Sequence, residues 1–250
     1  MCKKHTLPLH CQNKNSNPMF TYKYPHPAVT TDCVIFGFDG RELNVLLIER
    51  GIPPFKGDWA LPGGFIKMDE TAEEGARREL LEETNVSDVY LEQFHTFSTV
   101  DRDPRERVIT IAYFALVRKS DFRIIGGDDA ARAEWHPLKN LPHLAFDHSE
   151  IIRLARERLQ ERLATKPIAF RLLDEKFKMS ELQRIYEIIN DKTYERRNFA
   201  KKMMATGLLI DEGPNPTPEP NRAATLYRFN EDEYLRKCQS RQWKKYPFDF

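Results

Sequence analysis

The chain has 250 residues and nearly balanced charge, with 39 Lys and Arg against 38 Asp and Glu. It contains no apolar run of membrane length and no signal-peptide pattern, so a membrane-spanning protein is excluded and a soluble, cytoplasmic one is predicted. The four cysteines form no CxxC pair and are expected to be reduced, and the length favours two modest domains over one large one.

Residues 1–22 form a polar, proline-containing segment that we expect to be a disordered leader. Cys2, His5, His10 and Cys11 lie in it without a flanking core, so a zinc site is not expected there. The β-rich runs 28–38 and 43–48 flank Asp39-Gly40 and predict a hairpin. Further elements are expected as a loop over 51–64, a helix over 71–84, strands over 89–99 and 108–118, and a last element beginning at Trp135.

The segment from Gly64 to Val86 has a spacing with a direct chemical use. Glu79, Glu82 and Glu83 are three or four residues apart, or adjacent, so a helix places them on one face, where they can bind a hard cation such as Mg²⁺. Arg78, four residues before Glu82, can fix that carboxylate by an ion pair. Thr71 and Glu74 form a capping-box pair at the start of the helix.

This spacing resembles the Nudix box, and the one departure is Asn85 where the family has glycine. Asparagine is the usual second choice for the left-handed residue that closes a helix, so the fold can absorb the change. The resemblance implies an α/β/α sandwich, here expected over residues 23–146. After it, apolar residues at helical spacing predict a linking helix over 147–166, capped by Asp147 and Glu150. It also implies a Mg²⁺-dependent hydrolase of a nucleoside diphosphate derivative such as ADP-ribose, unless the box is retained only as a scaffold.

The remaining chain predicts a winged helix-turn-helix over residues 167–240, followed by a tail over 241–250. A helix opening at Ser180, with Ser180 and Gln183 as a capping pair, precedes a basic helix over 194–205. Two strands, 208–210 and 224–229, flank a proline-rich wing. Residues 151–250 hold 21 Lys and Arg against 15 Asp and Glu, whereas the preceding residues hold 18 against 23, as expected if the carboxyl-terminal part contacts a polyanion.

Basic, amide and aromatic side chains of this region are the candidates for DNA contact, because Arg and Asn pair with base edges and Lys and Arg bind phosphate. The candidates are Lys192, Tyr194, Arg196, Arg197, Asn198, Lys201, Lys202, Asn221, Arg222 and Arg228.

A Nudix domain followed by a basic winged helix resembles the Nudix-related transcriptional regulators. The segments Gly127–Ala130 with Trp135, Leu144–His148 and Arg197–Phe199 are similar to sequences in that group. Within it the chain is most similar to the branch that represses L-arabinose utilisation genes as a homodimer and is released from operator DNA by the sugar. The resemblance therefore implies an α+β protein with operator DNA, L-arabinose and a second copy of the chain as partners.

Two hypotheses follow, a ligand-controlled DNA-binding repressor and a Mg²⁺-dependent hydrolase, and the repressor is favoured because it gives the carboxyl-terminal domain a role. DNA binding is expected to require no cofactor. Effector contacts are expected from Trp59, His95, Asp101, Arg102 and Arg105, on loops or strand ends near the pocket. In the hydrolase, Glu70, Arg78 and Glu82 would be catalytic, Glu79, Glu82 and Glu83 would hold the metal, and a further base would come from Asp128, Asp129 or Glu134.

Overall fold

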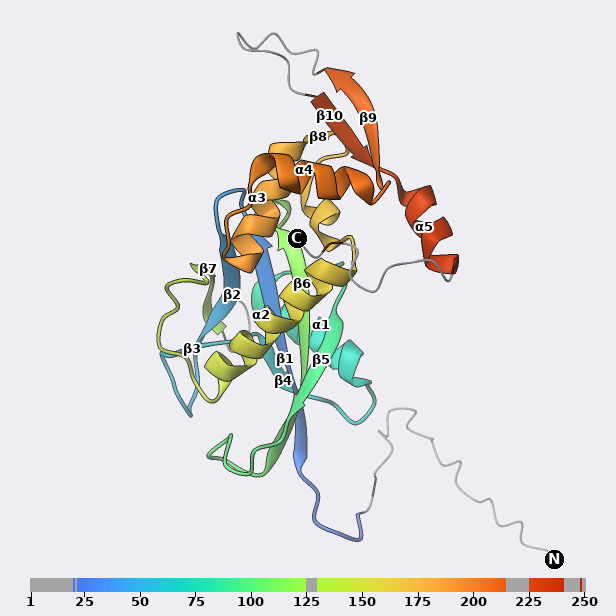
Figure 1. The fold of residues 1–250 in the computed structure, drawn as a ribbon. Helices are drawn as coiled ribbons and strands as arrows, with labels where there is room; N and C mark the ends of the chain where they lie inside the picture. The colour runs from blue at the N-terminus through green and yellow to red at the C-terminus, as the bar shows by residue number, and fades with distance from the viewer. Residues whose placement is uncertain (1–19, 21, 125–129, 215–224, 241–247, 249–250) are drawn as a thin grey trace, which may run out of the picture.

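The computed structural model describes residues 20, 22–124, 130–214, 225–240 and 248. The leader except for two residues, the tail except for Phe248, most of the proline-rich wing, and the candidates Asn221, Arg222, Asp128 and Asp129 lie outside these residues. The elements, shown in Figure 1, are β1 (Ala28–Phe38), β2 (Leu43–Arg50), β3 (Trp59–Ala60), β4 (Gly63–Phe65), α1 (Ala72–Thr84), β5 (Glu92–Phe97), β6 (Val108–Arg118), η1 (Lys119–Asp121), β7 (Ala130–Pro137), α2 (His148–Thr165), η2 (Ile168–Leu172), β8 (Phe177–Lys178), α3 (Met179–Asn190), α4 (Arg196–Ala205), β9 (Leu209–Pro214), β10 (Thr225–Phe229) and α5 (Glu231–Gln239).

A mixed sheet lies between α1 and α2. Its main path is β3-β2-β1-β6-β5, in which β1 runs antiparallel to β2 and parallel to β6. Alternate residues of β1 face opposite sides, because successive strand side chains point to opposite faces. Cys33 and Ile35 pack with Leu80 of α1, whereas Val34 and Phe36 lie in the core that contains Leu159 of α2. The predicted α/β/α sandwich and the 28–38/43–48 hairpin are therefore confirmed.

The ends of α1 follow from local sequence. The Glu74 amide donates to Thr71 Oγ1 at 3.3 Å, and the Thr71 amide donates to Glu74 Oε2 at 2.8 Å. Asn85 closes the helix in the left-handed conformation, with φ of 58° and ψ of 24°. Both predictions, the capping box and the left-handed asparagine, are confirmed.

Helix α2 begins as expected at residue 148, but its predicted capping is wrong. Asp147 occupies the N-cap position without a side-chain cap hydrogen bond. Its carboxylate instead accepts two hydrogen bonds from Arg102, at 2.6 and 2.9 Å, and Glu150 pairs with Arg153 at 2.7 Å. A guanidinium is a stronger partner for a carboxylate than a backbone amide, so the distant arginine displaces the local cap.

The carboxyl-terminal domain is a winged helix in which α3 and α4 precede the antiparallel pair β9 and β10. The sequence did not predict β8, which pairs with β10, or the helix α5. The prediction that Ser180 and Gln183 cap this helix is also wrong. Helix α3 starts at Met179, one residue before Ser180, and Glu181 accepts from the Lys178 amide at 2.7 Å. In β7, likewise, Trp135 lies inside the strand and does not begin it.

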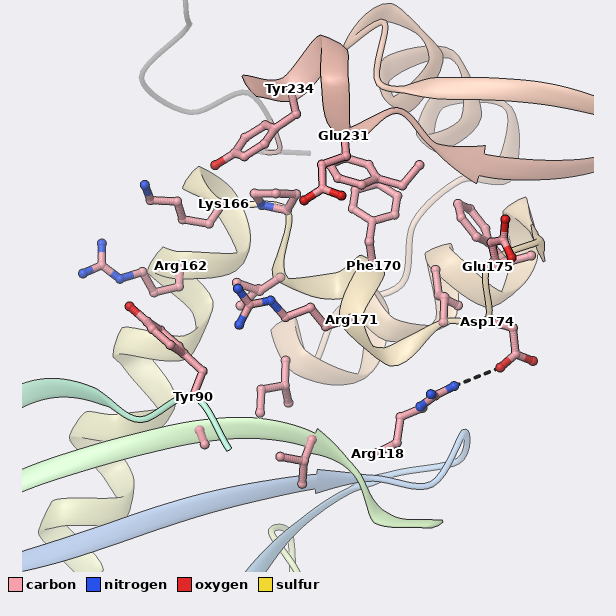
Figure 2. A pocket seen from close by; sticks show the side chains of 18 of the residues that line it. Tyr90, Arg118, Arg162, Lys166, Phe170, Arg171, Asp174, Glu175, Glu231 and Tyr234 are labelled. Carbon is pink, nitrogen blue, oxygen red and sulfur yellow. Dashed lines mark hydrogen bonds and ion pairs between the residues drawn. The ribbon is translucent and has the colours of Figure 1, made fainter. Parts of the chain in front are cut away.

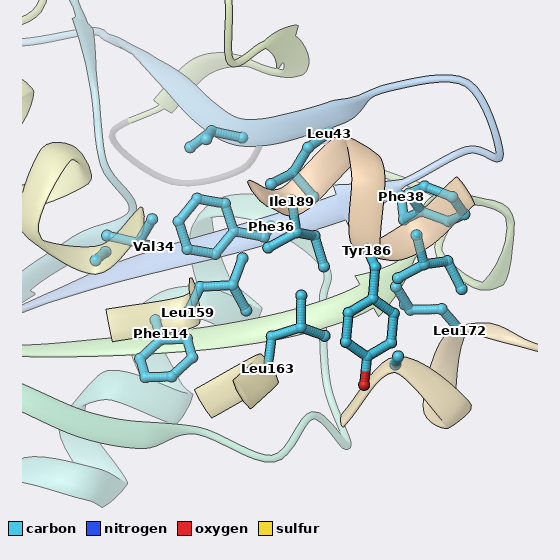
Figure 3. Packing of buried hydrophobic residues seen from close by; sticks show 14 of the residues in the cluster. Val34, Phe36, Phe38, Leu43, Phe114, Leu159, Leu163, Leu172, Tyr186 and Ile189 are labelled. Atoms are coloured by element: carbon cyan, nitrogen blue, oxygen red, sulfur yellow. The ribbon is translucent and has the colours of Figure 1, made fainter. Parts of the chain in front are cut away.

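One apolar core joins the two domains. Phe36 of the sheet, Leu159 of α2 and Tyr186 of α3 belong to the same buried cluster, and Figure 3 shows α2 and α3 side chains meeting over the sheet. Each of these side chains is fully buried. In the part of the chain that the structure describes, no helix has the length and apolar character needed to cross a bilayer.

Candidate functional site

A polar cleft of about 880 Å³ lies beside the Nudix box. It is bounded by the middle of the sheet, by α1, by the loop that follows β5 and by the start of α2. Its lining residues are Thr30, Asp32, Ile48, Arg50, Ile52, Leu61, Gly63, Gly64, Phe65, Lys67, Arg78, Glu79, Glu82, Glu83, Arg102, Asp103, Arg105, Phe146 and His148. The cleft thus combines carboxylates from α1 with cations from β2, the box and the loop.

Arg78 connects the box carboxylates. Its guanidinium donates to both oxygens of Glu70, at 2.9 and 2.7 Å, to Glu79 at 2.7 Å and to Glu82 at 2.9 Å. The hydrogen bonds from Arg78 lower the pKa of Glu70 to about 2. The predicted Arg78–Glu82 ion pair is present, and the arginine fixes two further carboxylates as well.

Two other box carboxylates, those of Glu79 and Glu83, are shielded from solvent. Burial raises the pKa of Glu83 to about 8 and also raises that of Glu79. Glu83 Oε2 accepts from the Gly63 amide at 2.8 Å. Gly64 has no side chain for a physical reason, because a Cβ there would lie 2.5 Å from Glu79 Oε1. The first glycine of the box therefore makes room for a carboxylate on the helix.

The chemistry of this donor set fits a hard divalent cation. Glu79, Glu82 and Glu83 offer carboxylate oxygens, which Mg²⁺ prefers. Burial raises the pKa of Glu79 and Glu83, and a bound cation would offset the cost of ionising these buried carboxyl groups. These three residues would hold the ion. Among the described residues, no three acidic, histidine or cysteine side chains converge as a ligand group. Arg78 contacts one oxygen each of Glu79 and Glu82, and the Gly63 amide contacts one oxygen of Glu83, so each carboxylate keeps a second oxygen for an ion.

A buried ion network closes the cleft at the start of α2. Arg102 is almost fully buried and lies between Asp147, at 2.6 Å, and Asp32, at 3.4 Å. His148 Nδ1 accepts from the Leu61 amide at 2.9 Å, so the hydrogen of a neutral ring is on Nε2, which faces Asp32 at 3.5 Å. Burial lowers the pKa of His148, consistent with the neutral form.

The expected effector residues divide into two groups. Arg102 and Arg105 line the cleft, whereas Trp59, His95 and Asp101 do not. Trp59 packs against His136, with ring centroids 4.2 Å apart, and Arg132 lies over its ring. His95 is exposed on β5 and Asp101 on the following loop. Glu134, the described candidate for a further base, pairs with Arg132 and is also outside the cleft lining.

Four lining residues, Arg50, Phe65, Lys67 and Phe146, were not predicted from the sequence, whereas Arg105, which contacts two of them, was. Arg50 and Arg105 lie over the ring of Phe146, with the guanidinium carbons 5.0 and 5.7 Å from its centroid, and Arg105 also lies over Phe65. Lys67 lines the same cleft. Only Arg50, at the end of a strand before a glycine-rich loop, carried a local signal.

Helix α4 presents five of the eight described candidate DNA contacts to solvent. Arg196, Arg197, Asn198, Lys201 and Lys202 are exposed, while Phe199 and Met203 are buried in the core. This separation leaves one continuous basic and amide face on the helix. Figure 1 shows α4 and the β9–β10 wing at the same end of the molecule.

The other described candidates have structural partners. Tyr194 packs against Phe199, and its hydroxyl accepts from Asn190 at 2.8 Å. Lys192 is exposed and lies over the Tyr194 ring. Arg228 pairs with Glu212 at 3.1 Å.

A second cavity, of about 1060 Å³, opens between the two domains (Figure 2). Its lining carries both signs of charge, including Lys166, Arg171 and Glu231. The Arg171 guanidinium lies 5.3 Å from the centroid of Tyr90. On one side, Arg118 bridges to Asp174 at 2.9 Å.

The sequence matches two family models. The NUDIX domain model matches residues 26–155, and the model of the NrtR DNA-binding winged helix domain matches residues 169–229. By fold, box and site, the chain is a Nudix-domain protein with a carboxyl-terminal winged helix. It belongs to the Nudix family, in the group whose winged helix is of the NrtR type.

Three relatives are informative. The "ADPR responsive transcriptional repressor NtrR" of Acinetobacter baylyi is 35% identical over 84% of this chain and 85% of its own length. The crystal structure of Shewanella oneidensis NrtR is 35% identical, with a TM-score of 0.67 over 82% of this chain and 95% of that one. The same protein has been solved with a 27mer DNA, at a TM-score of 0.65 with 34% identity, over 82% of this chain and 94% of that one.

Its NUDIX domain has also been solved with ADP ribose, at 37% identity and a TM-score of 0.51 over 58% of this chain and 94% of that one. The ADP-ribose pyrophosphatase of Methanocaldococcus jannaschii is 44% identical over 52% of this chain and 73% of its own length.

Proposed function

We propose that this chain is a transcriptional repressor that binds operator DNA through α4 and is released by ADP-ribose bound in the Nudix cleft. The observation that carries the proposal is the exposed basic face of α4 on a body that contains an effector-sized charged cleft. Relatives with both domains support each half, because one is named an ADPR-responsive repressor and another has been crystallised with DNA. A homodimer, formed through the Nudix domains, would present two α4 helices to successive half-sites.

The DNA half is supported by the residue types on α4. Arg197 and Asn198 lie in its first turn, and in helix-turn-helix proteins the first residues of the second helix contact base edges. Lys201 and Lys202 follow on the exposed surface, where they would bind phosphate. The binding is therefore expected to weaken steeply with salt.

ADP-ribose fits the cleft better than the L-arabinose expected from the sequence resemblance. A pentose is uncharged, whereas the cleft contains Arg50, Lys67, Arg78, Arg102 and Arg105, which suit a diphosphate. The rings of Phe65 and Phe146 add apolar surface for a base. The names of the relatives reported above point to ADP-ribose and give L-arabinose no support.

The Arg197→Ala variant tests the DNA half. Operator DNA is first obtained by selecting random-sequence duplexes on the wild-type protein. The variant is expected to bind the selected duplex about 1 to 3 kcal/mol more weakly, because a bidentate contact to a base edge is lost. Binding to a scrambled duplex is expected to change much less, as measured by fluorescence anisotropy. Equal losses on both duplexes would mean that Arg197 contacts phosphate only, and the failure of any duplex to be selected would contradict DNA binding.

A second candidate function is Mg²⁺-dependent hydrolysis of ADP-ribose, which is favoured by the complete set of box glutamates and by the pyrophosphatase relative. In that case Glu82→Gln is expected to abolish the release of AMP from ADP-ribose with Mg²⁺, because one of three metal carboxylates is lost. The same variant is expected to keep wild-type operator affinity. If it loses operator affinity instead, the metal site supports the DNA-binding state.

A further inference from the structure

The turn between α3 and α4 is ion-paired to the Nudix side of the molecule. Asp191 ends α3 in the left-handed conformation, with φ of 50° and ψ of 45°. Its Oδ1 is 2.8 Å from Lys139 Nζ, and its Oδ2 is 3.7 Å from Arg156 Nη2. Lys139 follows β7 and Arg156 lies on α2. Two separate elements thus hold one carboxylate at the entrance to α4.

Helix α4 is fixed to α3 by several contacts. Glu187 Oε1 accepts from the Tyr194 amide at 3.1 Å, and Gln183 Nε2 donates to the Tyr194 carbonyl at 2.9 Å. The Tyr186 and Phe199 rings pack edge to face, with centroids 5.4 Å apart. A displacement of α3 therefore carries α4 with it.

The opposite end of α2 belongs to the cleft. Arg102, which lines the cleft, donates twice to Asp147 at the start of this helix. Nine residues later, about 14 Å along the axis, Arg156 faces Asp191. One turn further on, Gln160 Nε2 donates to the Ile189 carbonyl of α3 at 2.9 Å. Helix α2 therefore touches both the cleft and the end of α3.

The fully buried side chains that join the two domains are close-packed and hold the domains together. On the other side of the junction, the cavity of about 1060 Å³ leaves the domains without close packing (Figure 2). Asp191 does not line this cavity, and its two ion pairs add directional contacts between the α3–α4 turn and the Nudix domain.

We propose that Lys139, Arg156 and Asp191 form a turn clamp, which positions α4 relative to the Nudix domain and transmits the state of the cleft to it. The claim that the clamp transmits the state of the cleft rests on the proposed function. The claim that it positions α4 does not. Lys139 and Asp191 are exposed over 74% and 54% of their side chains, and a pair this exposed contributes at most about a fivefold change in an equilibrium. Such a contact adjusts an angle between two packed states without being needed for folding.

The test uses Asp191→Asn in the full-length protein. Asparagine keeps the size of the side chain and tolerates the left-handed conformation, so the variant is expected to fold. Asp174→Asn is the matched control, because it breaks the Arg118–Asp174 pair between the same domains away from the turn. Spin labels on Glu106→Cys and Lys201→Cys, with Cys2, Cys11 and Cys238 replaced by serine, report the distance between the Nudix domain and α4 by pulsed electron paramagnetic resonance. Cys33 is buried and is not expected to be labelled.

Asp191→Asn is expected to shift or broaden the distance distribution, and Asp174→Asn to leave it unchanged. An Asp191→Asn distribution identical to that of the wild type would overturn the clamp. This measurement needs neither DNA nor effector, so it judges the clamp even if the wild-type protein binds no operator and the proposed function fails.

In the second measurement, the factor by which ADP-ribose lowers operator affinity is compared between variants. Asp191→Asn is expected to reduce this factor about three- to fivefold, the size of effect available to an exposed ion pair. The Kd for ADP-ribose without DNA is expected to stay unchanged. If ADP-ribose lowers the operator affinity of Asp191→Asn by the same factor as that of the wild type, the clamp does not transmit the state of the cleft to α4.

Discussion

Replacing Arg102 with methionine is expected to lower the free energy of unfolding by about 3 to 5 kcal/mol, the cost of removing one partner of a buried ion pair. The Arg102 side chain is 4% exposed, and its guanidinium pairs with both Asp32 and Asp147. Without it, the neutral His148 is the side chain that faces Asp32 among the described residues. Urea denaturation at pH 7 measures the loss.

Two further variants make this result specific. Arg158→Met removes an exposed arginine that pairs with Glu161 on the surface of α2, and it is expected to cost less than about 1 kcal/mol. Adding Asp32→Asn and Asp147→Asn to Arg102→Met is expected to recover part of the stability, because no unpaired charge is then buried. A loss for Arg102→Met no larger than that for Arg158→Met would show that the network does not hold α2 on the cleft.

The Glu83→Gln variant is expected to be more stable than the wild type at pH 8, and the difference is expected to disappear near pH 4.5. Burial raises the pKa of Glu83 from 4.5 to about 8 in the folded protein. Between these values the folded state keeps a proton that the unfolded state has lost. Wild-type stability therefore falls as the pH rises through this window, on the order of 1 kcal/mol per unit for this group. Glutamine remains neutral and still offers an oxygen to the Gly63 amide.

This comparison is made by thermal denaturation in EDTA over the range from pH 4.5 to 8. Glu106→Gln, at an exposed position, is the control and is expected to show no pH-dependent gain. Adding Mg²⁺ at pH 8 is expected to stabilise the wild type more than Glu83→Gln, because the cation favours the ionised carboxylate. A difference between the two proteins that is constant with pH would show that Glu83 is ionised in the folded state.

The sequence predicted those features that depend on residues close together in the chain. Thr71 with Glu74, and Asn85, fixed both ends of α1, because capping requires only local backbone groups. The β-rich run that forms β1 and the basic face of α4 were visible for the same reason. The box carboxylates lie within one helix, and so their common neighbourhood followed from helix geometry.

The features that were not predicted depend on distant partners. The Arg102–Asp147 contact joins residues 45 apart and removed Asp147 from the capping role that its position indicated. His148 is buried and accepts from the Leu61 amide, which is 87 residues away in the chain. Arg50 and Phe146 meet in the cleft only because the sheet brings them together. Local propensity contains no information about such pairs.

The most direct test of the account is the release of operator DNA by its effector. Labelled operator duplex, selected on the wild-type protein and saturated with it, is titrated separately with ADP-ribose and with L-arabinose at constant salt, with EDTA present to prevent hydrolysis. The account predicts that ADP-ribose dissociates the complex and that L-arabinose leaves it intact. A complex that survives ADP-ribose at concentrations that saturate the free protein, or one that L-arabinose dissociates, would contradict it.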